Sequence, residues 1–370
     1  MTAVDRGSRL VERTRELVGI PSESGNEADA LTHVRATMPP DPWTVVDEAE
    51  SIVLFATGGA TEGARSVVLA GHVDTVPRGE AAAAAVDGAD VVGRGAADMK
   101  SGVAVMLELA DSMAKGDIES DLDVAFLFFG REELPFGESA LMPFLHRSER
   151  TRNADLAIVL EPTSNGVEVG CLGNLNARVI VRGSAAHSAR PWLGDNAIHG
   201  AITALGSIVD LPVRDVEVDG LVYREAISVT SIQGGTAANV VPDLVTALVN
   251  FRYAPSRSPD DAEGRLRELL GHRKLDLEVL GNAPPGLVPV GNPLVDRLRR
   301  AGDLPVAPKQ AWTPVAEFGV VGVDAVNFGP GDARYAHADD ERVEKDSLVR
   351  SYEVLRAFLM GDGAAKERIA

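Results

Sequence analysis

The chain has 370 residues, with 36 Lys and Arg against 55 Asp and Glu, so its formal net charge is −19. At roughly 150 residues per domain, this length suggests two or three domains. The acidic excess argues against nucleic-acid binding and against adhesion to an anionic membrane, because both require clustered basic side chains. The single cysteine, Cys171, excludes an intramolecular disulfide framework.

The N-terminal segment has no basic stretch followed by an apolar one, so we expect no secretory signal. No apolar run approaches the roughly 20 residues that span a bilayer. With one cysteine, these features indicate a soluble, cytoplasmic protein with neither a nucleic-acid nor a membrane partner.

The first predicted element is a helix around residues 8–18, where apolar residues fall on one face: Leu10, Val11, Thr14, Leu17 and Val18. Short, nearly continuous apolar runs then predict buried parallel strands at residues 66–70, 123–129, 155–160 and 325–328. A second helix is predicted from Met99 to about Lys115, with Val103, Met106, Leu107 and Ala110 on one face. Strands alternating with helices predict an α/β sheet covered on both faces by helices.

The middle of the chain has a different pattern. From residue 176 it predicts strand, helix, strand, strand, helix and strand, which is the ferredoxin-like βαββαβ order. The Gly- and Pro-rich residues 281–293 then lead back to the first pattern. We therefore expect an inserted domain at 176–285 within a discontinuous α/β domain formed by 1–175 and 286–370.

Residue types that bind metals follow the predicted strands closely. In chain order they are His72 and Asp74, then Glu132 and Glu133, then Glu161, then Asp332 and His337, with Asp98 at the entry of the second helix. In an open α/β sheet, ligands bind at the carboxyl ends of the strands. We therefore expect these side chains to meet at one edge of the sheet.

Each of these residues alone has an ordinary structural interpretation. A single acid after a strand is more often a helix N-cap or a solvated turn, and His72 alone is about as often a core histidine as a ligand. Five carboxylates at one edge repel one another unless a cation neutralises them: Asp74, Asp98, Glu132, Glu133 and Glu161. Two histidines among carboxylates suit zinc.

Competing catalytic motifs are absent from the sequence. It contains no phosphate-binding G-x-x-x-x-G-K-[ST] loop, no G-x-S-x-G elbow and no H-E-x-x-H. The segment GRGAAD has Asp98 where a dinucleotide fingerprint has its third glycine. Cys171 has no evident base beside it and is interpreted as structural.

The motifs together resemble the M20 metallopeptidase and deacylase family, from about residue 8 to 358. They are GHVDTVP, GRGAADMKSG, FGREE, LEPT, GSAAHSARPWLGDNAIH, TAANVVPD, FRYAP and FGPGDARYAH. Within the family, the chain is most similar to the actinobacterial branch of succinyl-diaminopimelate desuccinylases. The resemblance implies a di-zinc exopeptidase-like catalytic domain, an inserted lid and dimerisation domain, and a homodimer.

The resemblance also implies roles for individual residues. His72, Asp98 and Glu161 would bind one zinc, and Asp98, Glu133 and His337 the second, with cobalt as a possible substitute. Asp74 would orient His72, Glu132 would be the general base, and His187 would act on the reacting carbonyl across a dimer interface. Asn239, Arg252 and Thr313 match positions that hold the substrate.

The implied reaction is amide hydrolysis of a small N-acyl amino acid, with release of succinate from N-succinyl-L,L-2,6-diaminopimelate in lysine biosynthesis. Another deacylase of the acetylornithine type, a dipeptidase and a non-catalytic binding protein are the alternatives. Three departures bear on the acyl group. Pro314 stands where many relatives have Asp, and Cys171 stands where some desuccinylases have Arg. The segment from 77 to 93 is short and alanine-rich.

Overall fold

The structure is a computed structural model that describes residues 3–57, 63–81, 83–271 and 275–361. The chain divides into two units. Unit 1 comprises Met1–Gly170, Leu287–Ala307 and Thr313–Ala370, and unit 2 comprises Cys171–Gly286 and Pro308–Trp312. The boundaries expected at 176 and 285 lie within five residues of these, whereas the return of Pro308–Trp312 to unit 2 has no signal in the sequence pattern.

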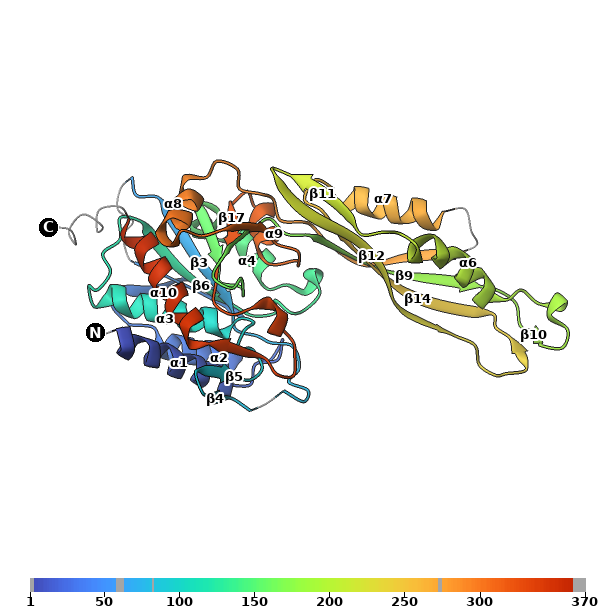
Figure 1. Ribbon diagram of the computed structural model, residues 1–370, viewed down its shortest axis with the longest axis horizontal. Coiled ribbons are helices and arrows are strands. Elements are labelled where there is room, and N and C mark those ends of the chain that lie inside the picture. The colour runs from blue at the N-terminus through green and yellow to red at the C-terminus, as the bar shows by residue number, and fades with distance from the viewer. Residues whose placement is uncertain (1–2, 58–62, 82, 272–274, 362–370) are drawn as a thin grey trace. The chain divides into compact units, whose positions relative to one another are not determined.

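Unit 1 is built on a mixed eight-stranded sheet (Figure 1). In spatial order its strands are β1 (Trp43–Ala49), β2 (Ile52–Thr57), β6 (Asp123–Phe129), β3 (Ser66–His72), β7 (Leu156–Val159), β17 (Ala325–Asn327), β8 (Val167–Val169) and β16 (Val306–Pro308). The four strands predicted from apolar runs are the neighbours β6, β3, β7 and β17, and each pair among them is parallel. Every residue of β6, β7 and β17 is buried, which explains why their sequences are continuously apolar.

Helices cover this sheet in two groups. The first group consists of α1 (Ala3–Gly19), α3 (Lys100–Ala114), α8 (Pro293–Gly302) and α10 (Lys345–Met360), which pack on one another, with α3 against β3. In the second, α9 (Val315–Val320) packs on β17 and β7, and α4 (Leu141–Arg147) packs on α9; α2 (Ala28–Thr37) lies against β6, and α5 (Glu149–Arg152) follows α4. The predicted apolar face of α1 is buried at Leu10, Thr14 and Leu17. In α3, however, twelve of fifteen residues are buried, so this helix is enclosed on more than the one face expected.

A small sheet joins two distant segments of unit 1. It has the order β18 (Arg342–Glu344), β5 (Asp90–Val92) and β4 (Ala85–Asp87), with antiparallel pairs. The segment before Asp98 therefore lies beside the segment that follows His337.

Unit 2 has a five-stranded antiparallel sheet with the order β11 (Arg214–Val218), β12 (Leu221–Gly234), β14 (Leu244–Tyr253), β9 (Gly173–Arg182) and β15 (Leu275–Ala283). Helices α6 (Ala197–Val209) and α7 (Pro259–Leu270) share one apolar core with it, and a capping box at Ser258 begins α7. The predicted βαββαβ order is present in β9, α6, β12, β14, α7 and β15. The hairpin strand β11 is an addition, and its alternating half-exposed residues give a weak pattern.

Pro308–Trp312 is held to unit 2 by its own side chains. Gln310 Oε1 accepts the main-chain N–H of Arg224 at 3.0 Å, and its Nε2 donates to the Val222 carbonyl at 2.9 Å. The Trp312 indole donates to the Pro284 carbonyl at 3.0 Å. Within the described residues, no helix has both the length and the apolar character needed to cross a membrane.

Candidate metal centre and active site

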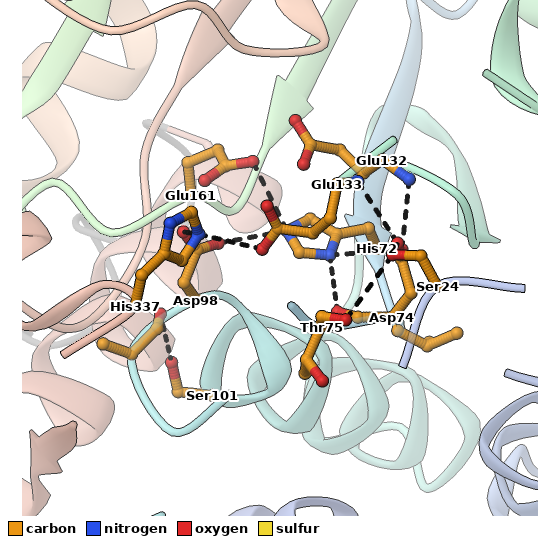
Figure 2. Close-up of polar contacts among 12 residues, drawn as sticks. Ser24, His72, Asp74, Thr75, Asp98, Ser101, Glu132, Glu133, Glu161 and His337 are labelled. Carbon is orange, nitrogen blue, oxygen red and sulfur yellow. Dashed lines mark hydrogen bonds and ion pairs between the residues drawn. The ribbon is translucent and has the colours of Figure 1, made fainter. Parts of the chain in front are cut away.

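The metal-ligand types lie where the central strands of unit 1 end. His72 is the last residue of β3, Glu132 and Glu133 follow β6, Glu161 follows β7, and His337 lies on the segment after β17. Asp98 comes just before α3, whose N-cap residue is Met99 and not Asp98. Figure 2 shows that these side chains converge. The topology of four parallel strands thus brings together residues that are up to 265 positions apart.

One group of potential ligands is formed by His72, Asp98 and Glu161. The Nε2 atom of His72 lies 3.0 Å from Asp98 Oδ1 and 3.8 Å from Glu161 Oε1. His72 is fully buried and Glu161 is 5 % exposed. The three side chains therefore point their ligand atoms at one another from three different elements.

A second group is formed by Asp98, Glu133 and His337. His337 Nε2 lies 3.0 Å from Glu133 Oε1 and 3.6 Å from Asp98 Oδ2. Asp98 thus offers one oxygen to each group. His337 has a φ of +63°, in the left-handed region that a non-glycine residue rarely adopts, and such strained residues are concentrated at functional sites.

The spacing of these atoms suits a divalent cation. Four ligands arranged tetrahedrally at about 2.0–2.2 Å from an ion lie about 3.3–3.6 Å from one another. The four contacts above, from 3.0 to 3.8 Å, bracket that separation. Imidazole nitrogens and carboxylate oxygens are the donor set, without a thiolate. A third group shares two residues with these: His72, Glu132 and Glu133 also have potential ligand atoms within 4.8 Å of one another.

The electrostatic field among these side chains favours positive charge. Burial lowers the pKa of His72, but hydrogen bonds to Asp74 and Asp98 outweigh it, so this pKa lies well above its ordinary value. For Glu132, burial raises the pKa, the charge of His72 lowers it, and the neighbouring carboxylates of Glu161 and Glu133 raise it further. The surrounding acids therefore stabilise a cation, and burial together with these acids keeps a proton on Glu132 to higher pH than usual.

Asp74 holds the loop that carries the two adjacent glutamates. Its carboxylate accepts the main-chain N–H groups of Glu132 and Glu133, each at 3.2 Å, and the hydroxyl of Ser24 at 2.6 Å. His72 Nδ1 lies 3.0 Å from the Asp74 carbonyl oxygen and 3.5 Å from its carboxylate. The main-chain carbonyl is thus the nearer partner of the histidine, and Ser24 is a site residue that sequence reasoning missed because serine in a loop carries no metal signal.

In unit 2, His187 and Asn239 are neighbours. His187 lies on β10 (Ala186–His187), which pairs with β13 (Val240–Val241), and the Ser188 N–H donates to the Asn239 carbonyl at 2.9 Å. Both side chains are exposed. The Ala189 N–H donates to His187 Nδ1 at 3.0 Å, so in the neutral ring the proton is on Nε2, which is then a hydrogen-bond donor.

Arg252 on β14 lies in a group of amide side chains. Its Nε donates to Asn250 Oδ1 at 3.2 Å, while Asn250 donates to Asn174 at 2.7 Å and to Asn176 at 2.8 Å. Burial lowers the pKa of the Arg252 guanidinium. No ion pair joins Arg252 to a carboxylate within the ranges that the structure describes.

The remaining predicted positions lie elsewhere in the two units. Thr313 is buried in unit 1, just before Pro314, which is the N-cap residue of α9. Cys171 is buried in unit 2, where its Sγ accepts the main-chain N–H of Gly286 at 3.1 Å. Asp332 caps the short helix Ala333–Tyr335 by accepting the Arg334 N–H, so it has a structural role on the segment that leads to His337.

Comparison with known proteins places this arrangement in a family. The profile of peptidase family M20/M25/M40 matches residues 68–361. A Corynebacterium glutamicum succinyl-diaminopimelate desuccinylase is 34% identical over 360 residues, which are 94% of this chain and 95% of that protein. A Mycobacterium tuberculosis protein, provisionally named a succinyl-diaminopimelate desuccinylase, is 36% identical over 357 residues, which are 95% of this chain and 98% of the M. tuberculosis protein.

Solved structures agree on the fold. The aminopeptidase PepT of Bacillus cereus superposes with a TM-score of 0.77 at 19% identity and covers 96% of this chain and 98% of its own. A tripeptidase of Staphylococcus aureus gives 0.79, with the same identity and coverage. This chain is therefore a metal-dependent amide hydrolase and belongs to peptidase family M20/M25/M40.

Proposed function

We propose that this protein is a zinc-dependent desuccinylase that hydrolyses N-succinyl-L,L-2,6-diaminopimelate to succinate and the free amino acid, in the cytoplasm. The observation that carries the proposal is the pair of ligand groups that share Asp98, with Glu132 beside them. The substrate comes from the names of relatives that match nearly the whole chain.

The metal centre we propose holds two zinc ions, with cobalt as a substitute. His72, Asp98 and Glu161 hold one ion, and Asp98, Glu133 and His337 hold the other. Histidine and carboxylate ligands without thiolates, and an aspartate with an oxygen toward each group, support this assignment. When bound, the ions supply Lewis-acid polarisation of the substrate carbonyl and make the attacking water more acidic.

Glu132 is the proposed general base. It takes a proton from the attacking water as the water oxygen bonds to the amide carbon, and it passes that proton to the amine as the carbon–nitrogen bond breaks. Burial and the neighbouring acids raise its pKa above that of an ordinary glutamate, which suits a group that must first accept a proton and then release it. Asp74 keeps this base in place through the main-chain N–H of Glu132.

His187 and Asn239 are proposed to donate hydrogen bonds to the oxyanion that forms on the carbonyl oxygen. The exposed Nε2–H of His187 supports this role, since Nδ1 is already occupied by the Ala189 N–H. We propose that they act across a homodimer that unit 2 forms. The exposed apolar residues Ile202 and Val209, seven positions apart on α6, support such an interface.

Arg252 and Thr313 are proposed to bind the substrate. A partly buried guanidinium that is oriented by an amide and has no acidic partner among the described residues suits a substrate carboxylate. Cys171 and Pro314 depart from the residues that the family resemblance leads us to expect at these positions, so the choice of succinyl over acetyl is the part of the proposal that the following test measures.

The test compares kcat/KM on N-succinyl-L,L-diaminopimelate with kcat/KM on N-acetylornithine and on a dipeptide, using the zinc-loaded protein. A preference for the succinyl substrate supports the proposal. Equal or better hydrolysis of N-acetylornithine or the dipeptide would assign the chain to a sister activity. No hydrolysis of any of the three by protein with its metals bound would favour a binding protein.

A further inference from the structure

Glu341 connects two segments that carry metal ligands. Its side chain is buried, and its Oε1 accepts the main-chain N–H groups of Ala97 at 3.0 Å and Asp98 at 3.1 Å. Its Oε2 accepts a charge-assisted hydrogen bond from Arg94 Nη1 at 2.9 Å. Glu341 itself follows His337 by four residues. The Glu341 carboxylate thus binds the segment that carries Asp98, while Glu341 itself lies on the segment that carries His337.

Arg94 and the main chain reinforce this connection. Arg94 Nη1 also donates to the Ala338 carbonyl at 3.2 Å, next to His337. The Gly93 N–H donates to the Glu341 carbonyl at 2.9 Å, and the pairing of β18 with β5 continues from there. The two segments are therefore joined by side-chain bonds in both directions as well as by a main-chain ladder.

We propose that Glu341 and Arg94 are positioning residues for the metal centre, which set the orientation of Asp98 and the distance from Asp98 to His337. The inference rests on the proposed two-metal site and adds two residues that lie outside the proposed ligand set and bond to the segments that carry the ligands. Asp98 presents different oxygens to His72 and to His337, so a small rotation of its main chain moves both oxygens at once. Partners that orient ligands in this way change metal affinity by about 10- to 100-fold when they are removed.

Conservative substitutions separate the two halves of the connection. Glu341→Gln retains one oxygen for the two main-chain N–H groups, but its amide nitrogen would face Arg94, so donor meets donor. Arg94→Lys retains the charge but replaces the planar guanidinium, whose Nη1 donates to both Glu341 and the Ala338 carbonyl, by a flexible ammonium group. Asp340→Asn is the matched control, because it removes the same charge from an exposed neighbour that pairs with Arg342.

The experiment is stepwise calorimetric titration of zinc into the metal-free full chain, with thermal unfolding of the same metal-free samples. We expect Glu341→Gln to weaken both zinc sites by about 10- to 100-fold, Arg94→Lys to weaken them less, and Asp340→Asn to leave them unchanged. The visible spectrum of the cobalt-loaded protein should also shift in Glu341→Gln, because the ligand geometry changes.

Wild-type zinc affinities in Glu341→Gln, even with a lower unfolding temperature, would show a merely structural role and overturn the inference. An equal loss in Asp340→Asn would overturn it too, because the loss would then reflect charge alone. If Glu341→Gln does not fold, Arg94→Lys decides by the same criterion. Failure of the wild-type chain to bind two zinc ions would instead refute the proposed metal centre.

Discussion

Glu317 offers a test of whether a buried acid of unit 1 limits stability at neutral pH. This residue of α9 is 1 % exposed, and its Oε1 accepts the hydroxyl of Ser139 at 2.5 Å. Burial raises the pKa of Glu317 to about 7, although the hydrogen bonds from Ser139 and the main chain of Met142 lower it. The carboxyl is therefore protonated in the folded state at pH values where an exposed glutamate is ionised.

The sign of the effect follows from proton binding. Between pH 4.5, the ordinary pKa, and pH 7, the folded state holds a proton that the unfolded chain has lost. The free energy of unfolding therefore falls as pH rises through this window and is constant with respect to Glu317 above it. At about 1.4 kcal/mol per pH unit, the contribution lost between pH 4.5 and pH 8 is about 3 kcal/mol.

Glu317→Gln removes this titration while it keeps an oxygen for Ser139. We expect the variant to match the wild type near pH 4.5 and to exceed it by up to about 3 kcal/mol at pH 8. Urea unfolding of the metal-free protein at a series of pH values gives the difference, and Glu138→Gln, at an exposed site three residues before Leu141, is the control. A Trp192→Phe and Trp312→Phe background leaves Trp43 as the fluorescent reporter of unit 1.

A stability difference between Glu317→Gln and the wild type that does not change from pH 5 to pH 8 would refute this reasoning. A difference that grows with pH equally in Glu138→Gln would attribute the effect to general charge repulsion. Comparing each variant with the wild type at the same pH cancels the titrations that the proteins share.

Three further predictions concern the site and its surroundings. Glu132→Gln should bind zinc normally by metal analysis and lose about 10²- to 10⁴-fold in kcat; wild-type turnover would contradict its role as base. Mixing His187→Ala with Glu132→Gln subunits should restore partial activity, and lack of rescue despite proven subunit exchange would exclude action across a dimer. Gly102→Ala should lower the unfolding temperature because its Cβ would lie 2.4 Å from the Leu160 carbonyl, whereas Gly206→Ala, with open space around it, should gain about 1 kcal/mol; equal gains in both would contradict the clash.

The central strands were predictable because burial on both faces leaves a continuous apolar run. Residues 66–70 and 123–129 correspond to β3 and β6 nearly residue for residue. The outer elements were not predictable in the same way. In β1, six of seven residues are exposed or half-buried, and every residue of β11 is exposed or half-buried. Neither strand therefore has the regular apolar pattern that would distinguish it from a loop in the sequence.

The prediction that metal-ligand types meet at one sheet edge depended only on strand order, since parallel neighbours end at the same edge. His72, Glu133 and Glu161 are brought together in this way. The return of Pro308–Trp312 to unit 2, in contrast, depends on hydrogen bonds of the Gln310 side-chain amide. Hydrophobic periodicity in the sequence does not reveal such bonds.

The acids around the site differ in what their oxygens face, and this distinction was invisible in the sequence. Asp98 and Glu161 point at imidazole nitrogens, as ligands of a cation do. Asp74 accepts the main-chain N–H groups of Glu132 and Glu133, and Glu341 accepts those of Ala97 and Asp98. Each pair includes one residue with a proposed role, Glu132 as the base and Asp98 as the shared ligand. A carboxylate satisfied by peptide groups fixes a loop without competing for the metal. In a chain with a net charge of −19, an acid near a metal centre is therefore assigned by the partner its oxygens face and not by its distance from the ligands.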